Sequence, residues 1–139
     1  ANIDPLTKSL TRRQLFNIAE SEFLRYARYR RPLSILVMDA DHFKKINDSF
    51  GHLFGDRVLT FTAELIRATL RASDIAARYG GDEFAVILPE TDRDEAVLVA
   101  GRILDAFQHS PFAAEGRMAF PIGASIASSS RGCAGGSAS

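Results

Sequence analysis

Two stretches of the sequence carry side chains suited to phosphate chemistry. The first, Asp39-Ala40-Asp41, ends an aliphatic run over residues 34–38. Alternate residues of a strand face the same side, so two carboxylates here are hard to bury without a compensating cation, and their oxygen atoms suit Mg²⁺. An ordinary alternative is that these carboxylates only cap a following helix. Taken alone, Asp39 and Asp41 are better explained as helix caps than as metal ligands.

The second stretch is Arg78-Tyr79-Gly80-Gly81-Asp82-Glu83-Phe84. Its two glycines would let a phosphate approach the backbone N–H groups of a turn, while Asp82 and Glu83 supply oxygen ligands. A hairpin turn explains the glycines equally well, since glycine supplies the positive φ of many tight turns. An arginine, a glycine pair and two carboxylates together, beside a strand that ends at Asp39, favour a nucleotide site of the two-metal type.

The elements that must position these residues follow from hydrophobic periodicity. Helical spacing predicts helices over 11–31, 53–71 and 92–109, and apolar runs predict strands over 34–38, 74–79, 83–88 and 118–127. Thr11 or Ser9 is expected to cap the first helix and Asp92 the last. The residues expected to face the core are Phe16, Phe23 and Tyr26 in the first helix, and Ala96, Val97, Val99, Ala100, Ile103, Leu104 and Phe107 in the last.

Composition excludes several functional classes. The chain has 139 residues, 46% of them hydrophobic, with 17 basic and 17 acidic side chains, which suits one globular domain. Balanced charge argues against a general nucleic-acid surface, and the lack of a long apolar run predicts a soluble, cytoplasmic chain. The single cysteine, Cys133, excludes an internal disulfide and a cysteine-based zinc site. Residues 128–139, rich in Ser and Gly, are expected to be a disordered tail after a domain over 4–127.

Several motifs together resemble the GGDEF domain of diguanylate cyclases. They are Asp39 to Asp48, Gly51-His52, Gly55-Asp56 and Arg78 to Phe84, and Asp4-Pro5-Leu6-Thr7 is similar to the usual opening of that family. The resemblance covers residues 4 to about 127. It implies an α/β (α+β) fold with a central, mainly antiparallel sheet flanked by helices. This is the palm-like fold of nucleotidyl cyclases, with the GGDEF motif on a β-hairpin.

The resemblance also implies an activity and a set of site residues. The activity is the condensation of two GTP molecules into cyclic di-GMP and pyrophosphate, by two domains that each present one GTP, with Mg²⁺ or Mn²⁺. Asp82 and Glu83 would be catalytic, and Glu83 would act as a metal ligand or help to deprotonate the attacking hydroxyl. The implied metal ligands are Asp39, Ala40 through its carbonyl, Asp82 and Glu83, and the implied GTP contacts are Phe43, Lys44, Asn47, Asp56, Gly80 and Gly81.

A further motif, Arg71-Ala72-Ser73-Asp74, resembles the Arg-x-x-Asp inhibitory site at which many members bind their product. Arginine offers a planar fork for a guanine edge or a phosphate, and aspartate accepts from guanine nitrogens. Arg78 is grouped with this product site. The ordinary alternative is a helix C-terminus at which Arg71 complements the helix dipole.

The match departs from the family pattern in two places. Lys8-Ser9 stands where the family usually has Gly-Leu. Ala124 to Ala127 leads into the Ser/Gly tail, where members usually have a final helix with phosphate-binding cations and an edge strand.

Two functions therefore stay open. The first is an active cyclase, expected to follow a sensory or receiver domain in a longer protein. The second is a weak or inactive module that binds cyclic di-GMP or GTP as a receptor. A generic α/β interaction domain is not favoured, because all of these motifs would then have to occur together by chance.

Overall fold

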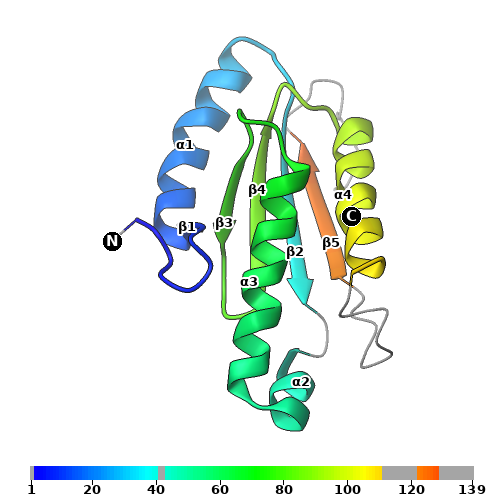
Figure 1. Ribbon diagram of the computed structural model, residues 1–139. Coiled ribbons are helices and arrows are strands. Elements are labelled where there is room, and N and C mark those ends of the chain that lie inside the picture. The colour runs from blue at the N-terminus through cyan, green and yellow to red at the C-terminus, as the bar shows by residue number, and fades with distance from the viewer. Residues whose placement is uncertain (1, 41–42, 111–121, 129–139) are drawn as a thin grey trace.

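A five-stranded sheet forms the centre of the molecule (Figure 1). The computed structural model describes residues 2–40, 43–110 and 122–128, with 40, 43–46 and 122–128 described as backbone alone. The strands are β1 (Leu10–Thr11), β2 (Leu33–Ala40), β3 (Ile75–Arg78), β4 (Glu83–Pro89) and β5 (Ile122–Ser128). Their order is β1-β3-β4-β2-β5. Only the β1–β3 pairing is parallel within this sheet, so the predicted mainly antiparallel α+β fold is confirmed.

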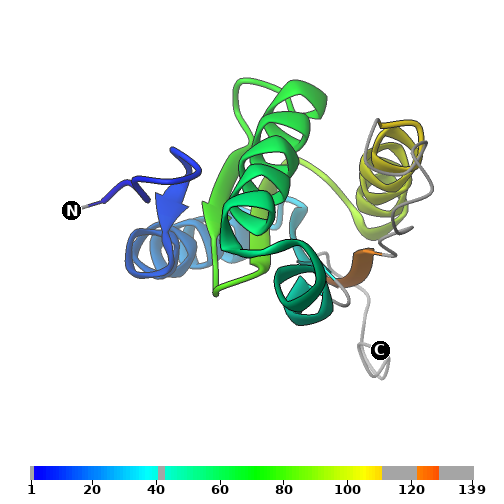
Figure 2. The same cartoon turned by 60° about the horizontal axis from the view of Figure 1, so that its bottom comes forward.

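Helices cover both faces of the sheet (Figure 2). They are α1 (Arg12–Arg28), α2 (Phe43–Phe50), α3 (His52–Thr69) and α4 (Arg93–Gln108). Alternation along β4 explains the layering, because Phe84, Val86 and Leu88 pack against α3 and α4, whereas Ala85 and Ile87 pack on the side of α1. Both faces of β4 are thus buried, which is why it reads as an unbroken apolar run.

Two of the helices begin at the predicted caps. The hydroxyl of Thr11 accepts a hydrogen bond from the backbone N–H of Gln14, and Asp92 forms a reciprocal capping box with Glu95. These bonds satisfy backbone donors that have no partner within the helix. None of the helices in the described ranges is long and apolar enough to cross a membrane.

Two residues predicted to face the core do not. Phe16 is 50% exposed and Val97 is 49% exposed. Not every apolar residue of α4 faces the core. The buried face of the helix includes Ala96, Ile103 and Phe107, and Val97 lies outside this face. Phe16 instead contacts Tyr79, the residue that follows β3, with the ring centroids 5.9 Å apart.

The strand predicted near the C-terminus is partly described. β5 pairs with β2 from Ile122 to Ser128, so Ser128 lies in the sheet rather than in a tail. The expected start of this strand over 118–121 and the expected tail over 129–139 lie outside the described residues.

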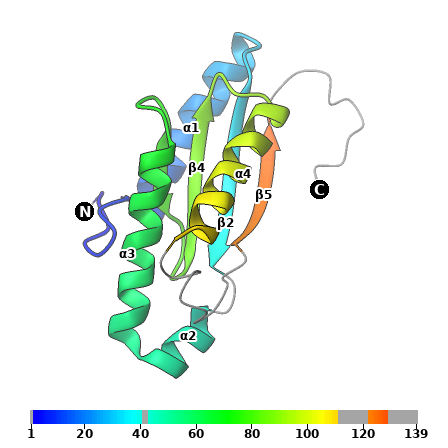
Figure 3. The ribbon, with the colours of Figure 1, turned by 45° about the vertical axis from the view of Figure 1, so that its right-hand side comes forward.

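The two ends of the sheet carry different candidate sites (Figure 3). At one end, β2 finishes and the β3–β4 hairpin turns, close to α2. At the other end, the loop from α3 into β3 lies near the loop from β4 into α4, and Arg71 of the first loop donates to the carbonyl of Pro89 at 2.9 Å.

Candidate functional site

Carboxylates from two strands meet at the first end of the sheet. Asp39, near the end of β2, is the register partner of Glu83, the first residue of β4. Side chains of directly paired residues on antiparallel strands are neighbours, with Cβ atoms roughly 4.5–5.5 Å apart. Asp82 precedes Glu83 in the hairpin turn. The structure therefore places the two acidic motifs side by side although they are far apart in the sequence.

The hairpin turn has a different conformation from the one expected. The N–H groups of Tyr79 and Gly80 both donate to the Glu83 carbonyl, at 2.8 and 3.3 Å. The expectation that these glycines supply a positive φ was wrong, because Gly51 is the only glycine with a positive φ in the described part of the chain. A Cβ at Gly80 would lie 2.7 Å from Oε1 of Glu83, so a larger residue there would displace this flexible carboxylate, whereas a Cβ at Gly81 would meet nothing within 4 Å.

The donors at this end fit a magnesium ion. Among the described residues, no group of three or more His, Cys, Asp or Glu side chains is placed to hold a metal ion. Mg²⁺ is usually bound by one or two carboxylates, with phosphate oxygens and waters as its other ligands. Asp39, Asp82 and Glu83 offer oxygen ligands of this type, and the carbonyl of Ala40 adds a backbone oxygen at the end of β2.

The predicted guanine contacts lie on two consecutive helices. Asn47 is in α2 and Asp56 in α3, and the two helices pack against each other. Gly51 joins them with φ 88° and ψ 165°, a region that is essentially restricted to glycine. Oδ1 of Asn47 is buried without a hydrogen-bond partner among the described residues. An unpaired buried oxygen is costly, so this atom is well suited to accept a bond from a ligand.

Three further predicted residues are placed by their backbone alone. Phe43 and Lys44 begin α2 and Ala40 ends β2, at the same end of the molecule as the hairpin. The side chains of Phe43 and Lys44 lie outside the described residues, as does the whole of Asp41.

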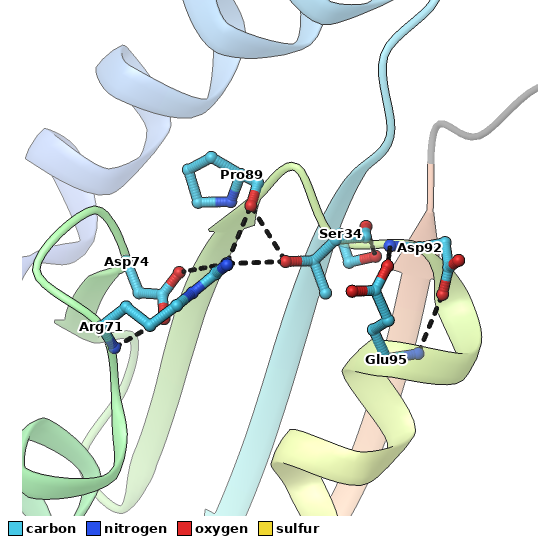
Figure 4. A network of polar contacts seen from close by, with 7 residues as sticks. Ser34, Arg71, Asp74, Pro89, Asp92 and Glu95 are labelled. Carbon is cyan, nitrogen blue, oxygen red and sulfur yellow. Dashed lines mark hydrogen bonds and ion pairs between the residues drawn. The ribbon is translucent and has the colours of Figure 1, made fainter.

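The Arg-x-x-Asp pair lies at the other end of the sheet (Figure 4). Nη2 of Arg71 lies 3.1 Å from Oδ1 of Asp74, and it also donates to the Pro89 carbonyl and to the Thr91 hydroxyl, each at 2.9 Å. The Asp74 side chain is only 2% exposed, whereas that of Arg71 is 56% exposed. The hydrogen bond with Asp74 raises the pKa of Arg71 further, so the guanidinium remains charged.

Arg71 and Asp74 line two cavities. One, of about 310 Å³, is lined by Lys8, Arg71 and Asp74 among others, and a second, of about 190 Å³, by Arg71, Asp74 and Thr91 among others. Spacing alone predicted neither the cavities nor the bonds from Arg71 to the loop after β4, because these partners are 18 and 20 residues away in the sequence.

Arg78 is separated from that pair. It ends β3, whereas Asp74 directly precedes the start of this strand. Its guanidinium contacts both carboxylate oxygens of Asp4 at 3.3 Å and donates to the Gly81 carbonyl at 2.7 Å. Sequence reasoning gave Asp4 no role, and the only signal was its place in the Asp4-Pro5-Leu6-Thr7 motif. The structure thus connects that motif to the hairpin.

Comparisons with known proteins agree with this geometry. A model of the family described as "Diguanylate cyclase, GGDEF domain" matches residues 1–132. A diguanylate cyclase of Vibrio cholerae is 40% identical over 112 residues, which are 81% of this chain and 35% of that protein. Diguanylate cyclase DgcP of Pseudomonas aeruginosa is 43% identical over 109 residues, 78% of this chain and 16% of that protein. The chain thus spans about a third or less of these relatives.

Solved structures show the same fold. The GGDEF domain of DgcB from Caulobacter crescentus, in complex with c-di-GMP, superposes with a TM-score of 0.84 at 26% identity, covering 92% of this chain and 77% of that one. The family match and the shared fold both extend over nearly the whole length of the chain. The chain belongs to the GGDEF domain family.

Proposed function

We propose that this chain is a diguanylate cyclase domain, which condenses two molecules of GTP into cyclic di-GMP and releases pyrophosphate. The observation that carries the proposal is the pairing of Asp39 with Glu83, which brings carboxylates from two strands beside a glycine-containing turn. The relatives named diguanylate cyclase support the same activity.

The metal ligands in this proposal are the carboxylates of Asp39, Asp82 and Glu83 and the carbonyl of Ala40. A bound Mg²⁺ or Mn²⁺ would neutralise phosphate charge and favour the deprotonated attacking hydroxyl. A triphosphate and these carboxylates carry charge of the same sign, so we expect nucleotide binding to depend strongly on the divalent cation.

The triphosphate would lie against the hairpin turn. Neither Gly81 nor Asp82 uses its backbone N–H in a hydrogen bond to another described residue, so these donors are available to an anion. The absence of a Cβ at Gly80 and Gly81 allows close approach. Phe43 and Lys44, at the start of α2, would add backbone and cationic contacts to the terminal phosphates.

Guanine recognition would rest on Asn47 and Asp56. The Asp56 carboxylate can accept hydrogen bonds from N1–H and N2–H of guanine, a donor pattern that adenine lacks. The buried Oδ1 of Asn47 would gain a partner when the base binds. A site with such unpaired polar groups discriminates against a base that cannot pair with them, which gives a physical basis for selecting GTP over ATP.

The reaction requires two copies of the domain, each presenting one GTP. The 3′-hydroxyl oxygen of one GTP attacks the α-phosphorus of the other, the new O–P bond forms, and the bond to the pyrophosphate oxygen breaks. The hydroxyl proton leaves to a base, for which Glu83 is the candidate, or to water. A second, equivalent transfer closes the ring and releases the second pyrophosphate.

Product would bind at Arg71 and Asp74. In the structure these side chains form an ion pair with each other, so a cyclic dinucleotide would have to replace contacts within this pair by its own hydrogen bonds. Arg71 can offer its fork to a guanine edge or a phosphate, and Asp74 can accept from guanine nitrogens. Arg78 was grouped with this site on sequence grounds, but its contacts at the other end of β3 lend that grouping no support.

The decisive experiment incubates the protein with GTP and Mg²⁺ and detects cyclic di-GMP by mass spectrometry. Asp82→Asn should lower turnover by roughly 100-fold or more, because it removes a charged ligand near the reacting phosphates. Asp105→Asn is the matched control, since its carboxylate is exposed on α4, an element that carries none of the proposed ligands. Equal turnover by wild type and Asp82→Asn would contradict the assignment.

A receptor function is the second candidate, and the cavities beside Arg71 and Asp74 favour it. It predicts that the wild-type chain makes no product but binds cyclic di-GMP in calorimetry, and that Arg71→Ala weakens this binding. Turnover of GTP by the wild type would refute a purely receptor role.

A further inference from the structure

The guanidinium of Arg78 joins two parts of the chain that are distant in sequence. Nη1 contacts both carboxylate oxygens of Asp4 at 3.3 Å, and Nη2 donates to the carbonyl of Gly81 at 2.7 Å. The side chains of Arg78 and Asp4 are 20% and 18% exposed, respectively. This ion pair is therefore largely shielded from water, which makes it stronger than an exposed pair.

Asp4 is itself held firmly within the N-terminal turn, which we define as residues 4–9. Its carboxylate accepts hydrogen bonds from the N–H and the hydroxyl of Thr7, both at 2.8 Å. The backbone of the turn is closed by bonds from Asp4 N–H to the Ser9 carbonyl and from Lys8 N–H to the Asp4 carbonyl. Arg78 is thus tied to an ordered segment.

The Gly81 carbonyl matters because of what shares its peptide plane. A trans peptide is planar, so its carbonyl and the N–H of the next residue point in opposite directions. A bond from Arg78 to the Gly81 carbonyl therefore fixes the direction of the Asp82 N–H, one of the donors available to an anion. It is also the only side-chain hydrogen bond to the backbone of residues 80–82 among the described residues.

We propose that Arg78 is a positioning residue, which orients the Gly81–Asp82 peptide for the triphosphate and makes the hairpin turn depend on the N-terminal turn through Asp4. The proposal rests on the proposed cyclase function and adds a path by which the N-terminal turn acts on it. Displacement of Asp4 removes one of the two anchors of Arg78, and the Gly81 carbonyl then loses a fixed partner.

The structure offers a matched control for this path. Arg67 of α3 holds the same N-terminal turn, since its Nη1 donates to the Thr7 carbonyl at 2.8 Å and to the Ser9 hydroxyl at 3.1 Å. It makes no contact with residues 80–82 among the described contacts. Arg67→Ala therefore loosens the turn without removing the bond to Gly81.

The experiment compares Asp4→Asn, Arg78→Lys, Arg78→Ala and Arg67→Ala. Hydrogen–deuterium exchange without ligand is measured on peptides covering 79–84 and 4–9. Asp4→Asn and both Arg78 variants should speed exchange over 79–84 by about tenfold or more, whereas Arg67→Ala should affect mainly 4–9. Arg78→Lys retains the charge but offers one nitrogen in place of a fork, so it tests the bridging geometry even where Arg78→Ala folds poorly.

Kinetics provide the second measurement. Asp4→Asn and Arg78→Lys should each lower kcat/KM for GTP by about tenfold, and the double variant should be no worse than Arg78→Lys alone, because coupled residues are not additive. Fully additive effects, or unchanged exchange over 79–84, would overturn the proposal. Wild-type protein without turnover would refute the cyclase function, while the exchange data would still decide whether Arg78 positions the turn.

Discussion

At the scale of single residues, Asn47 has a buried oxygen without a partner among the described residues and a proposed role in guanine binding. Its Oδ1 is buried without a partner among the described residues, in a helix where alanine is intrinsically better. We predict that Asn47→Ala raises the free energy of unfolding by roughly 1 kcal/mol in the absence of nucleotide. The same change should weaken GTP binding by about tenfold or more, because the base loses a hydrogen-bond partner.

Chemical denaturation and calorimetry with GTP would measure the two effects. Asn17→Ala is the matched control, since Asn17 is exposed within α1 and its replacement changes helix propensity alone. A large loss of stability in Asn47→Ala would contradict the interpretation of Oδ1 as an unpaired atom.

Asp4 makes stability depend on pH. Burial acts to raise its pKa, but hydrogen bonds from Thr7 and the charge of Arg78 outweigh this, so the pKa of Asp4 lies below its ordinary value. A group with a lowered folded-state pKa stabilises above its unfolded value, near 3.9, and loses that contribution as the pH falls through the folded value.

The free energy of unfolding of wild type should therefore exceed that of Asp4→Asn at about pH 6, and the difference should shrink below about pH 4. Urea denaturation across this range would measure it. A difference that stays constant down to about pH 2 would show that the Asp4 charge does not stabilise the fold.

At the scale of elements, the corner between α2 and α3 depends on Gly51. Its φ of 88° and ψ of 165° suit glycine alone, although a Cβ there would meet no atom within 4 Å. We predict that Gly51→Ala costs roughly 1–3 kcal/mol of stability through backbone strain. GTP affinity should fall as well, because Asn47 and Asp56 lie on the two helices that this corner joins.

Gly101→Ala in α4 is the matched control, since this glycine also has open space but a negative φ. It should stabilise the protein by about 0.5–1 kcal/mol, the usual gain in a helix interior. Thermal unfolding of both variants would show opposite shifts, and shifts of the same sign would contradict the strain argument.

Elements also show where sequence reasoning succeeded. The positions of α1, α3, α4 and the β3–β4 hairpin were predicted because periodicity and caps are local signals. The inward faces of Phe16 and Val97 were predicted wrongly, because which part of an apolar arc is covered depends on the neighbouring elements. Lys8 adopts a positive φ of 61°, a conformation that suits glycine, the residue expected at this position from the family resemblance. The sequence did not predict this positive φ, which is seen only in the backbone of the structure.

At the scale of the whole molecule, the candidate catalytic and product sites lie at opposite ends of the sheet (Figure 1). We predict that Arg71→Ala raises the concentration of cyclic di-GMP needed for half-inhibition by about tenfold or more, each variant being compared with its own uninhibited rate. Arg93→Ala, which removes an exposed cation at the start of α4, is the control. Equal inhibition of Arg71→Ala and wild type would place the product site elsewhere.

The sequence by itself determined α1, α3, α4, the longer strands, the acidic motifs and the family, because these depend on residue types at short spacing, whereas it predicted neither α2 nor β1. Only the tertiary structure decided which distant residues meet. Asp39 is the strand partner of Glu83, and Arg71 donates to the Pro89 carbonyl at the end of β4. Arg78 contacts Asp4 and Gly81 rather than Asp74. Such contacts join residues up to 74 positions apart. Their partners are selected by how the strands and helices pack in three dimensions, which no local pattern records.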